Sequence, residues 1–258
     1  MVRTFDHSGY FETRFILMLL ALTLALYFYF KKENKNYLVI FISATIFFGI
    51  VELVLQLLGM REEGFSISIF GFEIPFYITW LFQGLTEGGI HGVMGYLFLD
   101  IFLKKEQNEE YRKSLVLWII FIIIALIFAL IIGVLAKDQP ITSVRPMFGM
   151  INTIYLTSMI ILALILTKYV KINHIFRYLG IYLLGTFIYV LVNLETLHFF
   201  NVRYIGIEQA VDTVTMAPLL YQIMFMGYSH LIEVTLSRAH YFIIPVILGL
   251  MNLKRKMD

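Results

Sequence analysis

The sequence predicts an all-α integral membrane protein, a bundle of seven transmembrane helices whose last segment is kinked or broken. Of its 258 residues, 60% are hydrophobic and only 15% are charged, whereas a water-soluble domain carries about 25% charged residues. Six apolar stretches and a seventh, longer one can span a bilayer core, which needs about 20 residues. The net charge of +2 is spread over the loops, so nucleic-acid binding is excluded as the main role. The absence of cysteine excludes disulfides and cysteine-ligated clusters.

The expected spans follow one another with short connections, so the chain is predicted to form a single transmembrane domain. They cover residues 14–30, 37–59, 75–103, 114–136, 146–168, 177–199 and 214–253. Pro75 and Pro146 lie where the third and fifth helices are expected to start, and proline is well tolerated in the first turn of a helix.

The last apolar region is too long for one straight helix. Its 40 residues would measure about 60 Å as a helix, and the hydrocarbon core of a bilayer is about 30 Å thick. Pro218 suits a first helical turn, while Pro245 lies inside the apolar run and should bend it. We therefore expect this segment to be kinked, broken or partly interfacial.

The distribution of basic residues predicts the orientation of the chain in the membrane. Alternate loops and the C-terminal tail carry 13 lysines and arginines, and the opposite side carries 6, Arg14 among them. Because basic residues are retained on the cytoplasmic side, we expect the N-terminus outside and the C-terminus in the cytoplasm.

Seven ionisable residues fall well within the apolar spans. A charged side chain at the bilayer centre costs about 2.5–3.5 kcal/mol on insertion scales, so such residues usually face the bundle interior and have a function. Their positions along the second, third, sixth and seventh spans all correspond to the outer half of the membrane, which predicts one shared site. They are Glu52, Glu87, His91, Glu195, His198, His230 and Glu233.

Carboxylate and histidine side chains recur at short spacings in these spans. Three pairs lie three or four residues apart, and each pair therefore faces one side of its helix. Facing helices that carry Glu and Glu-x-x-His positions build metal sites in helical bundles, and mixed carboxylate and imidazole ligands suit Fe, Mn or Zn. The predicted metal ligands are His91, Glu195, His198 and His230, and the predicted catalytic carboxylates are Glu52, Glu87 and Glu233.

Other interpretations of the same residues remain open. A b-type haem held by His91 with His198 or His230 is a variant of the metal site. Gly84, Gly88 and Gly92 form a ridge of small residues on which another helix can pack, and the nearby polar pair would then only be hydrogen-bonded across that contact.

Two further charged pairs are expected. Asp100 and Lys104, one turn apart, are expected to form an ion pair at a helix end. Arg238 is expected to be the internal counter-ion of Glu233, or to extend its side chain to the inner membrane surface.

The leading functional hypothesis is a membrane-embedded metal-dependent enzyme, an oxidoreductase or a hydrolase. Its partner would be a membrane lipid, a quinone-like compound or another hydrophobic small molecule, and the metal would be Fe or Zn. The competing hypothesis is a proton- or cation-coupled transporter or channel in which the same carboxylates act as a relay. A third is a non-catalytic membrane subunit, in which the polar groups pair with one another or with a partner.

Overall fold

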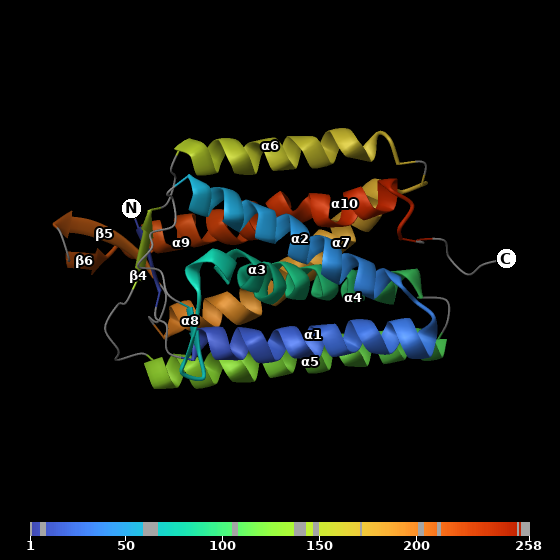
Figure 1. Cartoon of the computed structure of the whole chain (residues 1–258), viewed down its shortest axis with the longest axis horizontal. Helices are drawn as coiled ribbons and strands as arrows, with labels where there is room; N and C mark the ends of the chain where they lie inside the picture. The colour runs from blue at the N-terminus through green and yellow to red at the C-terminus, as the bar shows by residue number, and fades with distance from the viewer. Residues whose placement is uncertain are drawn as a thin grey trace.

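The computed structural model describes residues 2–5, 9–58, 67–104, 108–136, 143–146, 150–170, 172–200, 204–210, 213–251 and 253. Within these residues the chain forms seven helical runs that lie side by side with their axes roughly parallel (Figure 1). The prediction of an all-α bundle is therefore confirmed.

The first two runs are uninterrupted helices, α1 (Tyr10–Lys32) and α2 (Asn36–Leu57). Helix α1 follows Gly9, whose φ of 76° suits glycine, and Glu33, with a φ of 51°, follows its last residue. Lys31 and Lys32 occupy its last turn, where positive charge is favoured by the helix dipole. The connection brings Phe28 and Tyr37 into a stacked contact with ring centroids 4.0 Å apart.

The third run changes its helical type along its length. It starts with the 3-10 turn η1 (Phe76–Ile78) and continues as α3 (Thr79–Gln83), the π segment η2 (Gly84–Gly89) and α4 (Ile90–Leu103). The fourth and fifth runs are α5 (Asn108–Ala136) and α6 (Met150–Thr167).

The last two runs also contain π segments. The sixth consists of α7 (Ile175–Val190), the π segment η3 (Leu191–Glu195) and α8 (Thr196–Phe199). The seventh consists of α9 (Leu219–Tyr228), the π segment η4 (Ser229–Thr235), the 3-10 turn η5 (Leu236–Arg238) and α10 (Ala239–Ile247). The apolar region 214–253 is thus broken as expected, but the break lies at residues 229–238, ahead of Pro245.

Short strands at one end of the bundle were not predicted from the sequence. Strands β1 (Val2–Phe5), β4 (Ser143–Pro146), β5 (Ile205–Ala210) and β6 (Thr213–Met216) form an antiparallel sheet in the order β4-β1-β5-β6. Strands β2 (Ile67–Ile69) and β3 (Phe72–Ile74) form a hairpin. One expected helix start is thereby wrong, because Pro146 ends β4. Residues 214–216 of the last apolar region belong to β6, and α9 starts directly after Pro218.

The four-stranded sheet lies at the end of the bundle that holds the N-terminus, and the C-terminus lies at the opposite end (Figure 1). The described strands of the regions that the sequence analysis assigns to the outer side, β1, β4, β5 and β6, therefore gather at one end of the molecule.

Within the described part of the chain, four helices are long and apolar enough to cross a membrane, which indicates a membrane protein. They are Tyr10–Lys32, Asn36–Leu57, Glu109–Leu135 and Ile175–Phe199. Helix α5 presents large apolar side chains to the outside, and Ile119, Ile123 and Leu130 are 41–49% exposed, as expected of a surface that faces lipid. The seventh run is broken by η4 and η5, and a span there remains an expectation.

The predicted glycine ridge packs against helix α2 of the same chain. A Cβ added to Gly84 would lie 2.5 Å from the carbonyl oxygen of Thr45, and one added to Gly92 would lie 2.8 Å from the Cβ of Ala44. At Gly88 it would overlap the Ala44 carbonyl oxygen. The ridge thus lets the backbones of α2 and η2 approach closely, and so fixes the position of the π segment.

Substituting Gly88 tests this contact. Gly88→Ala is expected to destabilise the bundle by about 1–3 kcal/mol, as overpacking usually does, because the backbone of α2 must move. Gly180→Ala in α7 is the matched control, since no described atom lies within 4 Å of a Cβ at that position. Unfolding of both variants in detergent measures the difference; equal stabilities would contradict the close contact.

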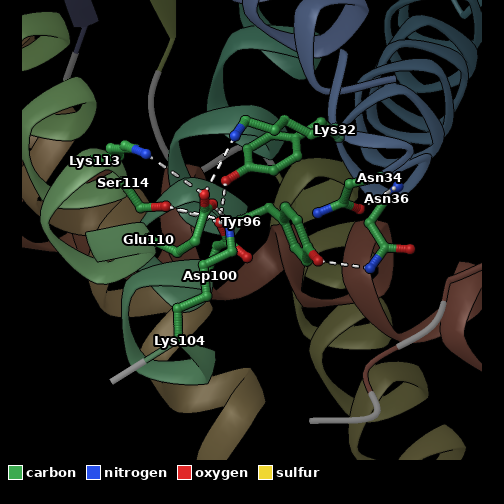
Figure 2. Close-up of polar contacts among 10 residues, drawn as sticks. Lys32, Asn34, Asn36, Tyr96, Asp100, Lys104, Glu110, Lys113 and Ser114 are labelled. Atoms are coloured by element: carbon green, nitrogen blue, oxygen red, sulfur yellow. Dashed lines mark hydrogen bonds and ion pairs between the residues drawn. The ribbon is translucent and has the colours of Figure 1, made fainter. Parts of the chain in front are cut away.

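A polar cluster ties the ends of several helices together at the end of the bundle opposite the sheet (Figure 2). Lys104 Nζ lies 2.7 Å from Asp100 Oδ2, which confirms the expected ion pair. The same buried carboxylate accepts hydrogen bonds from Tyr37 Oη at 2.7 Å and Ser114 Oγ at 3.0 Å. Asp100 thereby joins α2, α4 and α5.

Candidate metal centre

Each π segment of the described chain carries residues that the sequence analysis assigned to the site. Segment η2 carries Glu87, η3 ends at Glu195, and η4 carries His230 and Glu233. A π turn inserts one extra residue into an α-helix, and such turns are rare and frequent at functional sites. Three helical runs therefore depart from regular α-helix where their polar residues lie.

Glu195, His198 and His230 form a cluster that could bind a metal ion. Each offers one ligand atom, and the three atoms lie within 4.8 Å of one another. Glu195 Oε1 is 2.5 Å from His230 Nδ1, and Glu195 Oε2 is 3.9 Å from His198 Nδ1. The two imidazole rings have centroids 5.6 Å apart and planes inclined at 70°.

Two different helical runs bring these ligands together. Glu195 is the last residue of η3 and His198 follows three residues later in α8, so both face one side of the same run. His230 comes from η4, and the packing of α7 against η4 brings it to that side.

The backbone orients the ring of His198. Its Nδ1 lies 3.0 Å from the carbonyl oxygen of Leu194. When Nδ1 donates a hydrogen to this oxygen, the lone pair is on Nε2, the tautomer that a metal ligand needs. Metal-binding histidines usually make such a second hydrogen bond, which fixes the ring and its tautomer.

The burial of His230 also points to a ligand. Its side chain is 1% exposed, and its Nε2 has no hydrogen-bond partner among the described residues. A buried polar atom without a partner costs about 1–3 kcal/mol, and a bound ion or a water attached to one removes this cost. Glu195 has an exposure of 36%, so the cluster is closed on the His230 side and open on the Glu195 side.

The ligand set fits Zn²⁺ or Fe²⁺. Two histidines and one glutamate hold catalytic zinc with a fourth position open for water or substrate, and two histidines with one carboxylate hold non-haem iron. Ligand atoms about 2.0–2.2 Å from an ion lie about 3–4 Å from one another. In this structure the three ligand atoms lie up to 4.8 Å from one another, so small side-chain movements are required when an ion binds.

A pocket of about 610 Å³ adjoins the cluster, and Glu195 and His198 form part of its wall. We call it the α8–α9 pocket. Its remaining lining is mostly apolar and aromatic: Leu130, Thr196, Phe199, Phe200, Tyr204, Met216, Leu219, Gln222, Ile223 and Met226. The pocket places an apolar cavity directly against two of the three ligands.

Glu87 and His91 belong to a second polar cluster, the internal charge network, together with Arg14 and Arg238. Arg14 Nη1 donates to Glu87 Oε1, and Arg238 Nη2 lies 3.5 Å from Glu87 Oε2. Arg238 Nη1 contacts His91 Nδ1. The ring of His91 also packs against Tyr189, with centroids 5.4 Å apart.

This network corrects two assignments of charge made from the sequence. Arg14 was counted among the outer loop charges, but α1 starts at Tyr10 and Arg14 is only 8% exposed inside the bundle. Arg238 was expected to pair with Glu233 or to reach the inner surface, and its carboxylate partner is Glu87 instead.

The remaining two predicted carboxylates lie outside the three-residue cluster. Glu233 accepts a hydrogen bond of 2.9 Å from Ser229 Oγ one turn earlier in η4, and Glu52 is buried in α2 with 3% exposure. Three of the seven expected site residues are thus brought together, and the role of the other four as part of one site remains a prediction.

Comparisons with known proteins leave the chain without a relative from which a function could be transferred. No protein-family model, no curated protein and no solved structure matches it. The function is therefore inferred from the geometry of the site.

Proposed function

We propose that this protein is a membrane-embedded metal-dependent enzyme in which Glu195, His198 and His230 hold one Fe or Zn ion. The observation that carries the proposal is a two-histidine, one-glutamate cluster, two members of which line an apolar pocket. Three protein ligands leave a coordination position open, which distinguishes catalytic zinc sites from closed structural ones. The ion would polarise a substrate group or activate a bound water, and iron would also carry electrons.

The pocket favours a hydrophobic substrate, such as a lipid or a quinone-like compound. Two of its polar side chains are held by the backbone. Thr196 Oγ1 donates to the Val192 carbonyl oxygen at 2.8 Å, while Gln222 accepts from the Ile205 N–H at 2.8 Å and donates to the Ile205 carbonyl oxygen at 2.5 Å. Glu195 and His198 are the proposed metal ligands within the lining, so chemistry would occur at the metal while the rest of the wall holds an apolar body.

We further propose that the seven runs are seven spans, with the N-terminus outside and the C-terminus in the cytoplasm. With Arg14 placed inside the bundle, 13 basic residues lie on the predicted cytoplasmic side and 5 on the other, which supports this orientation. Helix α8 lies at the same end of the bundle as the sheet and the N-terminus (Figure 1). The metal cluster would accordingly lie in the outer half of the membrane, near the outer surface.

A metal-binding probe with a variable apolar tail tests the proposed function. The protein is loaded with Co²⁺, whose visible spectrum reports its coordination, and titrated with acetohydroxamate and octanohydroxamate. The longer compound is expected to bind more than tenfold tighter, because two buried methylenes at about 0.8 kcal/mol each give about tenfold.

Two variants of α9 provide the comparison for this titration. Met226→Trp narrows the pocket and is expected to weaken octanohydroxamate binding while acetohydroxamate binding changes little. Met224→Trp, at a position that is 59% exposed and not part of the lining, is the control. Equal binding of both hydroxamates, or equal effects of both variants, would contradict a substrate pocket at the metal.

The internal charge network favours a second candidate function, a proton- or cation-coupled transporter. Charged residues inside a membrane bundle frequently mark ion pathways, and Arg14, Glu87 and Arg238 are such residues. Proteoliposomes that contain the unmodified protein would then show pH-driven cation flux that Glu87→Gln abolishes. The enzyme hypothesis expects no such flux.

A further inference from the structure

We propose that the protein binds an anionic phospholipid in a second pocket, between α1 and α5 at the end of the bundle opposite the sheet. This α1–α5 pocket has a volume of about 380 Å³. Lys32 is the last residue of α1, and Glu110 lies in the first turn of α5. The pocket beside the metal centre contacts α5 near its other end, at Leu130, so the two pockets lie at opposite ends of α5. The proposal is independent of the metal chemistry.

The charges of the pocket are predominantly positive. Lys32, Arg112 and Lys113 line it, and Glu110 is the one acidic residue of the lining. Glu110 lies 3.2 Å from Lys32 and 3.8 Å from Lys113 (Figure 2), and it is shared with Lys104 at 3.8 Å. The exposed Glu109 also lies 3.8 Å from Lys113, and Lys104 also pairs with Asp100. The lining itself holds three basic residues and one acidic residue, so the pocket keeps an excess of positive charge.

Arg112 supplies the best donor for a phosphate group. It has no ion-pair partner among the described residues, and its planar guanidinium is suited to bind phosphate oxygens in pairs. The pocket also lies at the N-terminal end of the 29-residue helix α5, whose dipole favours an anion nearby.

The other wall of the pocket is apolar. Tyr27, Phe28, Val116 and Leu117 line it, and they lie on the parts of α1 and α5 that run side by side toward the middle of the bundle (Figure 1). Positive charge at the helix ends and an apolar wall along the helices match the two parts of a phospholipid, its headgroup and its acyl chains.

The position relative to the membrane supports a lipid rather than a soluble anion. Both α1 and α5 are long and apolar enough to cross a membrane, and the basic residues lie at their ends. A pocket at that depth opens where headgroups lie, and basic pockets between transmembrane helices at the cytoplasmic surface bind anionic headgroups.

Lipid binding by the delipidated protein in detergent tests the proposal. Native mass spectrometry would measure the binding of added phosphatidylglycerol and of added phosphatidylcholine, and phosphatidylglycerol is expected to bind more tightly. The bound phosphatidylglycerol is expected to stay bound when inorganic phosphate is added in excess. Arg112→Gln/Lys113→Gln is expected to weaken phosphatidylglycerol binding more than tenfold, since each basic residue at a membrane surface contributes about fivefold.

The control removes the same charge from another loop assigned to the same membrane side. Lys168→Gln/Arg177→Gln changes two exposed residues away from the pocket and is expected to leave binding unchanged. If the double variant Arg112→Gln/Lys113→Gln does not fold, phosphatidylglycerol binding is measured with the single variant Arg112→Gln instead. Equal binding of both lipids, equal effects of the two double variants, or displacement of the lipid by inorganic phosphate would each overturn the proposal.

Discussion

His230→Ala is expected to lower the bound metal from about one ion per chain to background, because a site of three protein ligands loses one of them. His230 comes from a different helical run than the other two ligands and is 1% exposed. Its removal therefore leaves Glu195 and His198 on one wall with no ligand opposite them. Elemental analysis of protein purified without chelators measures the effect.

His91→Ala is the matched control for this prediction. It removes the same side chain from another buried position, 6% exposed, where the ring contacts Arg238 and Tyr189. We expect this variant to keep its metal. Loss of metal in both variants would restore the single shared site that the sequence predicts, and retention in both would exclude His230 as a ligand.

Glu87→Ala is expected to destabilise the protein by about 3–5 kcal/mol, the usual effect of removing one partner of a buried ion pair. Glu87 faces Arg14 and Arg238, whose side chains are only 10% and 4% exposed. Without the carboxylate, two guanidinium groups remain in the bundle interior with no other ion-pair partner among the described residues. Unfolding by denaturant in detergent measures the change, and metal content should stay the same.

Glu110→Ala is the comparison for Glu87→Ala. Glu110 also faces several basic groups, but its side chain is 34% exposed, so water compensates for the lost contacts and the expected cost is about 0–1 kcal/mol. If both substitutions cost the same, the internal charge network does not stabilise the bundle.

Much of the helical architecture can be predicted from the sequence because apolar length determines it. Four of the seven predicted spans correspond to helices that are long and apolar enough to cross a membrane, namely α1, α2, α5 and the α7–α8 run. The Asp100–Lys104 pair could also be predicted, since a spacing of four residues within one helix fixes the geometry locally.

The division of the polar residues into two clusters could not be predicted. Similar depth in the membrane brings residues to one level, but the rotation of each helix decides which neighbours they meet. That rotation depends on contacts such as the one between Gly88 and Ala44, and on π turns, which shift the facing of every residue that follows. The spacing of three residues predicted Glu195 with His198, and the similar depth in the membrane predicted His230 beside them. Depth alone could not separate these three residues from Glu87 and His91.

Arg14 shows the same limit at the end of a helix. Its position at the start of an apolar run is typical of a residue at the membrane surface. The helix begins one turn earlier, at Tyr10, and the side chain points to Glu87. The signal for a buried arginine in the sequence is Glu87, a carboxylate in the apolar span 75–103 that needs a positively charged partner.

The most direct test of a metal centre is X-ray absorption at the metal edge of the unmodified protein, purified without chelators or reloaded with Zn²⁺ or Fe²⁺. We expect one ion per chain with a first shell of two imidazole nitrogens and carboxylate oxygen at about 2.0–2.2 Å, lost in His230→Ala. Protein that takes up neither ion in stoichiometric amount, or an ion with no imidazole in its shell, would contradict the proposal that Glu195, His198 and His230 hold a catalytic metal.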